Sequence, residues 1–445
     1  MRLKQSINFY NLLCRISLLM AAVLYFVWPL PHTMALRYLL LIVTASAGTI
    51  IYLSHAKPLK TIQEPWFLFF VALLCWGIFH AAFLSSNGAE AWSELRGEWF
   101  KAYLAMFGGI GCALASRNIK ESTFNFFFIV VLVAQPVLFL LLGAIKSLQQ
   151  GHMALNYWGL VDHKMSLAFF SHLMVSFSCA KLLDAMKFPI NVSTYMWLFF
   201  IALGFYIAVT TNTRNSIVLL SILCAMTAMF IIYRTRLNAP MITRAGLLTV
   251  LTVAIVSGVF FSSKTNGSWR NFGSDIKIAM QTEAYPNWIN RAKYGLPKNE
   301  NGVEVSDSNY ARIAFAVAGL EMVLQHPLGY GITRHAFENL VKIEHPDADI
   351  ANSHNGYIDF VASVGFPGLI LLLGGVFFAL KQIRESSSVW SRPAIWIITT
   401  IMFNWVLDPV SREHYFETLL FMVGLFSTLS LQTSQAKSGV RQTHL

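Results

Sequence analysis

The feature that most constrains this chain is the repeated occurrence of apolar runs of about twenty residues. A helix of about 20 apolar residues crosses the roughly 30 Å hydrocarbon layer of a bilayer. Inside that layer the backbone must satisfy its own hydrogen bonds, which favours helices. The sequence therefore predicts an all-α integral membrane protein with about twelve transmembrane helices. The predicted spans are 12–31, 34–53, 66–84, 99–115, 124–145, 165–183, 194–210, 215–233, 243–262, 357–380, 393–408 and 415–432.

The composition agrees with a chain surrounded by lipid. Of its 445 residues, 56% are hydrophobic and only 12% are charged, whereas globular chains average about 25% charged residues. The net charge of +11 comes from basic residues in short connections, where they set topology and meet anionic lipid headgroups. This placement argues against nucleic acid as a partner. The five cysteines lie in apolar runs and show no disulfide or metal-binding pattern.

The basic residues also predict the orientation of the chain. Every second connection carries Lys or Arg, beginning with Arg2 and Lys4 and ending with Lys437 and Arg441. Because Lys and Arg accumulate on the cytoplasmic side, we expect both termini in the cytoplasm. The long segment between the ninth and tenth spans then faces outward. The predicted organisation is spans one to nine in 1–262, a large outward loop in 263–356, spans ten to twelve in 357–432 and a cytoplasmic tail in 433–445.

The large loop contains an expected amphipathic helix within 308–331. Asp307 or Ser308 is its expected N-cap, and Pro327 and Gly329 end the run. The spacing predicts that its apolar face lies against the membrane domain. The residues of that face are Ile313, Val317, Leu320 and Leu324.

Two arginines are candidates for binding an anion. Arg214 lies in a polar turn, residues 210–216 (TTNTRNS), at the start of a span. There an unpaired cation is costly unless it faces water or a partner. Arg312 is expected in the first turn of the loop helix, where the helix dipole disfavours a cation. Guanidinium groups match phosphate geometry, although a snorkelling Arg214 and a solvated Arg312 are the simpler alternatives.

A histidine just before the tenth span is the candidate proton acceptor. His354 lies in the polar segment 352–357 (NSHNGY), where Ser353 and Asn355 are placed to orient it. Histidine exchanges protons near neutral pH, but a structural histidine at a membrane interface is the alternative. His335 and His345 are rivals in the same loop, with less compact polar surroundings.

Metal and cofactor chemistry is not indicated. The sequence lacks HExxH, Walker A and GxSxG patterns, and its His and Cys residues do not have ligand spacing. Asp347 and Asp349 in the loop give only a weak suggestion of a cation site. Glu90, Glu94 and Glu98 recur every four residues, which is most simply interpreted as one solvated helix face.

These motifs, in this order, resemble the O-antigen ligase family, within a superfamily of O-antigen ligases, O-antigen polymerases and bacterial protein O-oligosaccharyltransferases. The resemblance rests on the Thr-rich turn ending in Arg214, on ARIAFAVAGLEMVLQHPLGYGI with Arg312, and on SHNGYIDFVASVGFPGLI with His354. It covers about residues 194–380. The family has a fold similar to polyprenyl-dependent (GT-C type) membrane glycosyltransferases and acts without a metal or other cofactor.

The resemblance implies a transfer at the periplasmic face of the bacterial inner membrane. A polysaccharide on undecaprenyl pyrophosphate would move, with inversion, to a sugar hydroxyl of the lipid A–core oligosaccharide. Arg214 and Arg312 would bind the pyrophosphate, and His354 would act as the base. Asn355 and Arg412, the latter in the last outward turn, are further expected substrate contacts. An O-antigen polymerase or a protein-glycosylating transferase keeps the same chemistry, while a transporter would more often show two related halves.

Overall fold

The computed structural model describes residues 2–54, 60–161, 163–185, 192–233, 241–333, 335–408 and 413–442. Within these residues the regular structure is helical, apart from one isolated bridge between Lys298 and Glu304. The prediction of an all-α fold is therefore confirmed.

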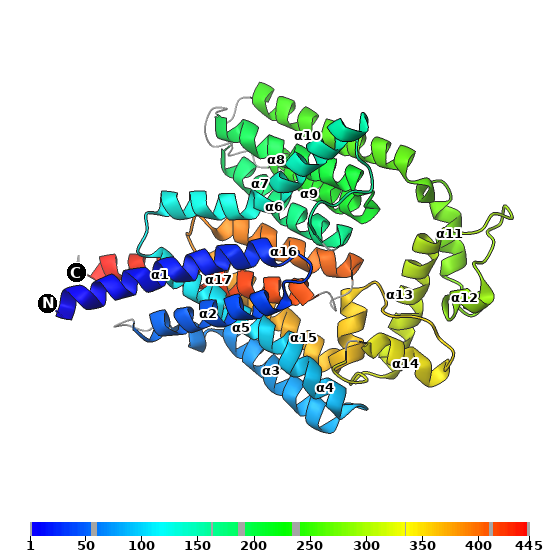
Figure 1. The fold of residues 1–445 in the computed structure, drawn as a ribbon, viewed down its shortest axis with the longest axis horizontal. Helices are drawn as coiled ribbons and strands as arrows, with labels where there is room; N and C mark the ends of the chain where they lie inside the picture. Colours follow the sequence, from blue (N-terminus) through cyan, green and yellow to red (C-terminus); the bar gives the residue numbers. More distant parts are fainter. Residues whose placement is uncertain are drawn as a thin grey trace.

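The long helices run roughly side by side in one bundle, and the shorter ones gather at one of its ends (Figure 1). The long helices are α1 (Arg2–Val27), α2 (Met34–Leu53), α3 (Pro65–Phe83), α5 (Phe100–Ser116), α6 (Glu121–Gln150), α7 (Lys164–Ala185), α8 (Val192–Thr210), α9 (Arg214–Tyr233), α10 (Met241–Thr265), α15 (Gly356–Glu385), α16 (Ser391–Leu407) and α17 (Glu413–Gln442). The shorter ones are α4 (Gly88–Glu94), α11 (Phe272–Ala279), α12 (Arg291–Tyr294), α13 (Asp307–Gln325) and α14 (Ala336–Glu344).

Ten helices in the described residues are long and apolar enough to cross a membrane, against twelve predicted from the sequence. The fourth and eleventh expected spans correspond to α5 and α16, which have 17 residues each. Most of α5 is buried by α2 and α17, and its Gly111 lies directly against Gly48 of α2. Small residues at such a crossing allow two backbones to approach closely, so α5 is a short central helix of the bundle.

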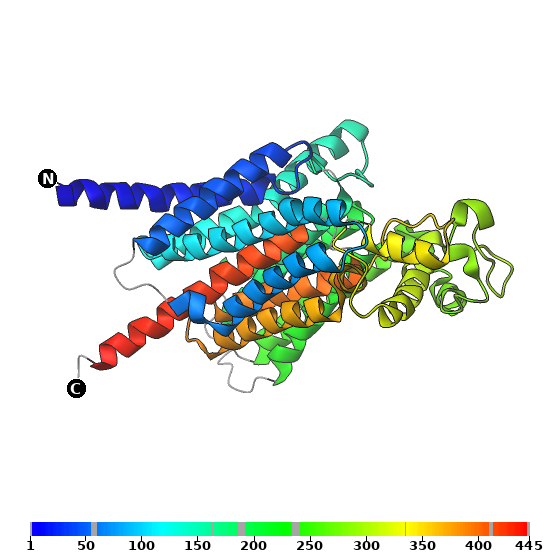
Figure 2. The ribbon, with the colours of Figure 1, turned by 90° about the horizontal axis from the view of Figure 1, so that it is seen from below.

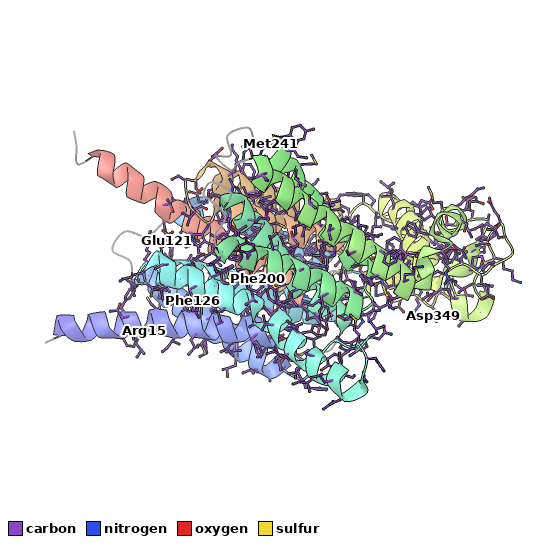
Figure 3. All side chains as sticks on the ribbon, turned by 90° about the horizontal axis from the view of Figure 1, so that it is seen from above. Arg15, Glu121, Phe126, Phe200, Met241 and Asp349 are labelled. Carbon is purple, nitrogen blue, oxygen red and sulfur yellow. The ribbon has the colours of Figure 1, made fainter. Side chains whose placement is uncertain are left out.

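The outer surface of the bundle is apolar. Phe126 of α6 and Met241 of α10 are exposed on this surface, whereas Phe200 of α8 points into the core (Figure 3). Many other large hydrophobic side chains on the long helices are exposed as well. Because a soluble protein rarely exposes large contiguous apolar areas, this surface is the one that lipid covers. The chain is a multi-pass membrane protein.

Helices α11 to α14 form a separate lobe at one end of the bundle, while the start of α1 and the end of α17 lie at the opposite end (Figure 2). The lobe has its own hydrophobic core, in which Tyr310, Phe315 and Phe337 are almost fully buried. Val361 and Ala362 of α15 belong to the same core. The lobe is therefore fixed to the bundle through the beginning of α15.

The loop helix is confirmed, but its predicted apolar face is only partly correct: Ile313 packs against the core of the lobe, whereas Leu320 and Leu324 do not. In α13 the buried side is formed by Tyr310, Ala311, Ala314, Phe315, Ala318, Met322 and Val323. Leu320 and Leu324 are 53% and 61% exposed. The N-cap is Ser306 rather than Asp307 or Ser308. Small residues were overlooked as core positions because alanine and glycine carry little apolar surface, yet they allow the close packing seen here.

A kink in α15 allows the segment that follows α13 to form hydrogen bonds with the first part of α15. Gly365 has φ of 71° inside the helix, which interrupts the helical hydrogen bonds. The carbonyl oxygens near the kink accept bonds from other elements: Tyr330 N donates to Ala362 O at 2.7 Å, and Trp76 Nε1 donates to Val364 O at 2.8 Å. The segment after α13 therefore supplies a hydrogen bond that the kink removes from α15, and it holds the first turns of α15 in place.

We expect Gly365→Ala to lower the stability of the protein by about 3 kcal/mol, because a positive φ and an overfilled contact are each costly. A Cβ atom at this position would lie 2.5 Å from the carbonyl carbon of Leu328. Thermal unfolding in detergent measures the effect. Gly246→Ala is the control, since a Cβ atom there meets open space. Equal melting temperatures for the two variants would contradict the packing argument.

Candidate active site

The turn that carries Arg214 is built by threonine side chains. The hydroxyl groups of Thr211 and Thr213 donate to Ile207 O at 2.7 Å and Ala208 O at 3.3 Å. The backbone N–H groups of the same two threonines donate to the same carbonyl oxygens, so each threonine is held at two points. The chain therefore turns within three residues, and Arg214 becomes the first residue of α9.

Arg214 reaches from the bundle to the first turn of α13. Its Nη2 donates to Ser308 Oγ at 2.9 Å, and its Nη1 donates to Asn309 Oδ1 and to Ser268 O. All of these acceptors are uncharged. Asp275 of α11 lies one step further away and accepts a 2.7 Å bond from Asn309 Nδ2. The guanidinium group is thus held in place while its positive charge stays available.

Arg312 makes the reciprocal connection. It lies in the second turn of α13, not in the first as predicted, because the helix begins at Asp307. Its Nη1 donates to Asn215 Oδ1, and Asn215 Nδ2 donates to Leu407 O at the end of α16. The charges of Arg214 and Arg312 are close enough to repel each other. Two like charges held together in a half-buried place favour binding of an anion.

A third cation, missed in the sequence, joins these two. Lys164, the first residue of α7, is half-buried and lies within electrostatic range of both Arg214 and Arg312. The connection before α7 contacts the Arg214 turn, since Asn156 N donates to Thr210 O at 2.7 Å. A lysine next to an apolar run looks like an ordinary residue at the membrane–water interface. The available signal was the predicted topology, which puts the start of the sixth span on the same side as Arg214.

His354 is held in a tight turn by its polar neighbours. It has φ of 56°, a conformation that non-glycine residues rarely adopt. Its backbone N–H donates to Asn352 Oδ1 at 3.1 Å, and the N–H of Ser353 donates to Asp359 Oδ1 at 2.9 Å. Asn355 caps α15 by accepting bonds from two backbone N–H groups. The neighbours of His354 therefore shape the backbone turn that presents the imidazole.

The imidazole of His354 lies against α13. It stacks on Phe315, with ring centroids 6.0 Å apart and planes inclined by 16°. Phe315 follows Arg312 by three residues, so the two side chains share one face of the helix. Ser308, which binds Arg214, is seven residues before Phe315, or about 10 Å along the axis. All three predicted principal residues thus meet the same short stretch of α13.

The other predicted residues are placed as follows. Asn355 is a helix cap, and its expected contact with substrate stays a prediction. Arg412 lies outside the described residues. His335 is half-exposed and pairs with Glu338 at 2.9 Å, while His345 meets the ring of Trp288 edge-on. Among the residues that the structure describes, no group of three or more His, Cys, Asp or Glu side chains could hold a metal ion.

Tyr310 is a further titratable group on α13. Its hydroxyl donates to Tyr285 O at 2.6 Å, and burial raises the pKa of Tyr310 to about 12. A phenol with this pKa keeps its proton at neutral pH and is a poor base. In this part of the lobe, His354 is better suited to accept a proton.

Together, the fold and the site define a multi-pass membrane protein with a cationic cluster near a histidine at one end of the bundle. Residues 199–373 match the family model described as O-antigen ligase (Wzy_C). The matched segment, which is similar to the O-antigen ligase domain, contains Arg214, Arg312 and His354. The family comprises O-antigen ligases, O-antigen polymerases and O-oligosaccharyltransferases, which are glycosyltransferase-like enzymes acting on lipid-linked glycans. No curated protein matches the chain in a sequence comparison.

Proposed function

We propose that this protein is an O-antigen ligase of the bacterial inner membrane. It transfers the O-antigen polysaccharide from undecaprenyl pyrophosphate to a sugar hydroxyl of the lipid A–core oligosaccharide. The observation that carries this proposal is the convergence of Lys164, Arg214 and Arg312, because a diphosphate supplies the negative charge that such a cluster favours. Both termini are then cytoplasmic, and the lobe with the site lies on the periplasmic face.

The reaction is a single displacement at the anomeric carbon of the donor sugar. The acceptor hydroxyl oxygen forms the new bond while the bond from the anomeric carbon to the pyrophosphate oxygen breaks, which inverts the configuration. The leaving pyrophosphate keeps the electron pair. Guanidinium groups fixed near that oxygen stabilise the growing negative charge. His354 accepts the hydroxyl proton as the new bond forms.

Two related activities remain as alternatives within the family. An O-antigen polymerase joins repeat units to each other, and a protein O-oligosaccharyltransferase uses a protein hydroxyl. Deletion of the gene in its host separates the first alternative from the ligase. We expect bare lipid A–core and accumulated lipid-linked polymer on a gel. Core carrying a single repeat unit would instead indicate a polymerase.

We expect the purified protein to transfer glycan to lipid A–core in the presence of EDTA at an unchanged rate, because fixed cations take the part that a divalent ion plays in other glycosyl transfers. The assay uses reconstituted protein, purified lipid-linked donor and gel mobility as readout. Loss of transfer with EDTA, and its recovery with Mg²⁺ or Mn²⁺, would contradict the role given to the arginines.

A further inference from the structure

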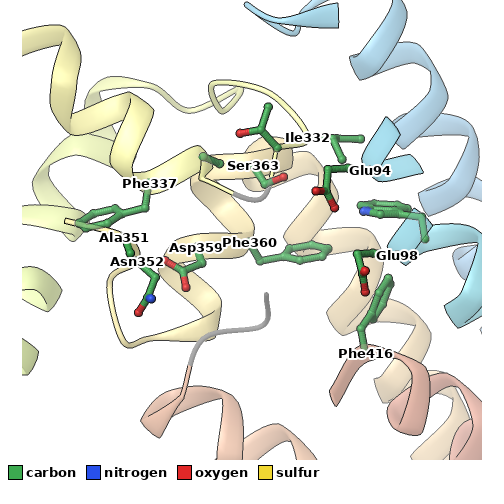
Figure 4. A pocket seen from close by; sticks show the side chains of 13 residues that line it. Glu94, Glu98, Ile332, Phe337, Ala351, Asn352, Asp359, Phe360, Ser363 and Phe416 are labelled. Atoms are coloured by element: carbon green, nitrogen blue, oxygen red, sulfur yellow. The ribbon is translucent and has the colours of Figure 1, made fainter. Parts of the chain in front are cut away.

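A cavity next to the His354 turn has walls unlike those of the cationic cluster. Its volume is about 110 Å³, and three carboxylate groups line it (Figure 4). Glu94 and Glu98 point into it from one side, while Asp359 and Asn352 lie on the other. The aromatic residues Trp99, Phe337, Phe360 and Phe416 also line it.

An unusual local helix adds Trp99 to the wall that carries Glu94 and Glu98. A π-helical turn, Leu95–Trp99, joins α4 to α5. Residues five apart in such a turn lie nearly above one another, whereas in an α-helix of 3.6 residues per turn they point to different sides. The π turn therefore brings Trp99 to the side that carries Glu94 and Glu98. These glutamates are half-buried, so the interpretation as one solvated face does not hold for this part of the helix.

The chemistry of the lining excludes a phosphate and suits a sugar. Carboxylate oxygens repel an anion but accept strong hydrogen bonds from hydroxyl groups. Asp359 Oδ2 is buried and has no hydrogen-bond partner among the residues that the structure describes, and a buried acceptor of this kind favours a ligand that donates. Glu98 accepts a 2.8 Å bond from Lys101, which fixes its orientation. Aromatic faces cover the apolar C–H surface of a sugar ring.

The cavity is linked directly to the proposed base. Asn352, in its wall, accepts the backbone N–H of His354, and Asp359 accepts that of Ser353. Phe337, also in the wall, contacts Phe315, on which the imidazole stacks. A molecule in the cavity therefore lies beside the turn that carries His354 and near the Phe315 face of α13.

We propose that this cavity binds the acceptor sugar, with Glu94, Glu98 and Asp359 accepting hydrogen bonds from its hydroxyl groups. The inference rests on the proposed transferase function. The site is divided by charge: the anionic pyrophosphate binds the cations, the uncharged sugar binds the carboxylates, and the imidazole serves the hydroxyl between them. The volume suits one sugar ring rather than a long glycan chain.

The test measures donor and acceptor kinetics separately in reconstituted full-length protein. We expect Glu94→Gln to raise KM for lipid A–core about tenfold, because a charge-assisted hydrogen bond is weakened, and to leave KM for the lipid-linked donor within about twofold. Glu90→Gln is the matched control: Glu90 lies one turn earlier in α4 and outside the cavity lining. An increase in the donor KM equal to that of the acceptor, or no change in either, would overturn the proposal.

A binding measurement separates this inference from the transferase proposal. The probe is core oligosaccharide released from lipid A by mild acid and labelled at its reducing end. We expect wild-type and Glu90→Gln protein to bind it, and Glu94→Gln to bind it about tenfold more weakly. Binding that depends on Glu94, in a wild-type protein that transfers no glycan, would support the sugar site and reject the transferase. Transfer without Glu94-dependent binding would reject the sugar site alone.

Discussion

Replacement of His354 by alanine is expected to lower the rate of glycan transfer by about 10²–10⁴-fold, which is the usual contribution of a positioned general base. Donor binding should stay largely intact, because the pyrophosphate contacts belong to Lys164, Arg214 and Arg312. The measurement is kcat with purified lipid-linked donor and lipid A–core, together with the affinity for donor alone. Near-normal transfer by the variant would refute the assignment of the base.

His354→Asn sharpens this test. His354 has φ of 56°, and asparagine tolerates this conformation better than alanine does. The variant therefore keeps the turn while it removes the basic imidazole, and we expect a loss of rate similar to that of alanine. His335→Ala and His345→Ala are controls that should retain transfer. If His354→Asn were active and His335→Ala inactive, the base would lie elsewhere in the lobe.

The membrane helices could be predicted because hydropathy is a local property. An apolar run about as long as the bilayer is thick has few alternatives to a helix, and nine of the twelve predicted spans end within four residues of the end of an observed helix. The exceptions are the runs 124–145, 357–380 and 415–432, whose helices α6, α15 and α17 continue further along the chain. The predicted fourth span, 99–115, is as short as α5, but the central place of α5 in the bundle could not be foreseen, since it depends on the contact of Gly111 with Gly48 of another helix.

The candidate site was only partly predictable. Arg214 was recognisable as a cation at the start of an apolar span, and His354 as a histidine in a compact polar segment. Arg312 was singled out by an expected first-turn position that is wrong, and by the motif in which it lies. Lys164 was not, because its importance comes from two arginines that are 50 and 148 residues away in the sequence. The same holds for Glu94 and Glu98, whose spacing of four indicates a helix face but not what that face meets. The role of each of these residues depends on side chains from distant parts of the sequence, which only the fold brings together.

Replacement of Arg214 or Arg312 by alanine is expected to lower kcat/KM by about 10²–10³-fold, the usual cost of removing one group that stabilises developing charge. Each alanine also removes a tie between α9 and α13, through Ser308 for Arg214 and through Asn215 for Arg312. Thermal unfolding must therefore accompany the kinetics. Lys277→Ala is the control, because it removes a positive charge from the lobe outside the site: Lys277 is exposed and pairs with Glu300. This variant should keep its kcat/KM.

Lysine variants separate charge from geometry at these two positions. Arg214→Lys and Arg312→Lys keep the positive charge but lose the planar fork that matches phosphate oxygens, so we expect about tenfold losses in kcat/KM and weaker donor binding. Because both side chains act on one diphosphate, the double variant should lose less than the product of the single losses. A purely multiplicative loss with unchanged donor affinity would mean that the two guanidinium groups act independently, and the shared pyrophosphate site would have to be abandoned.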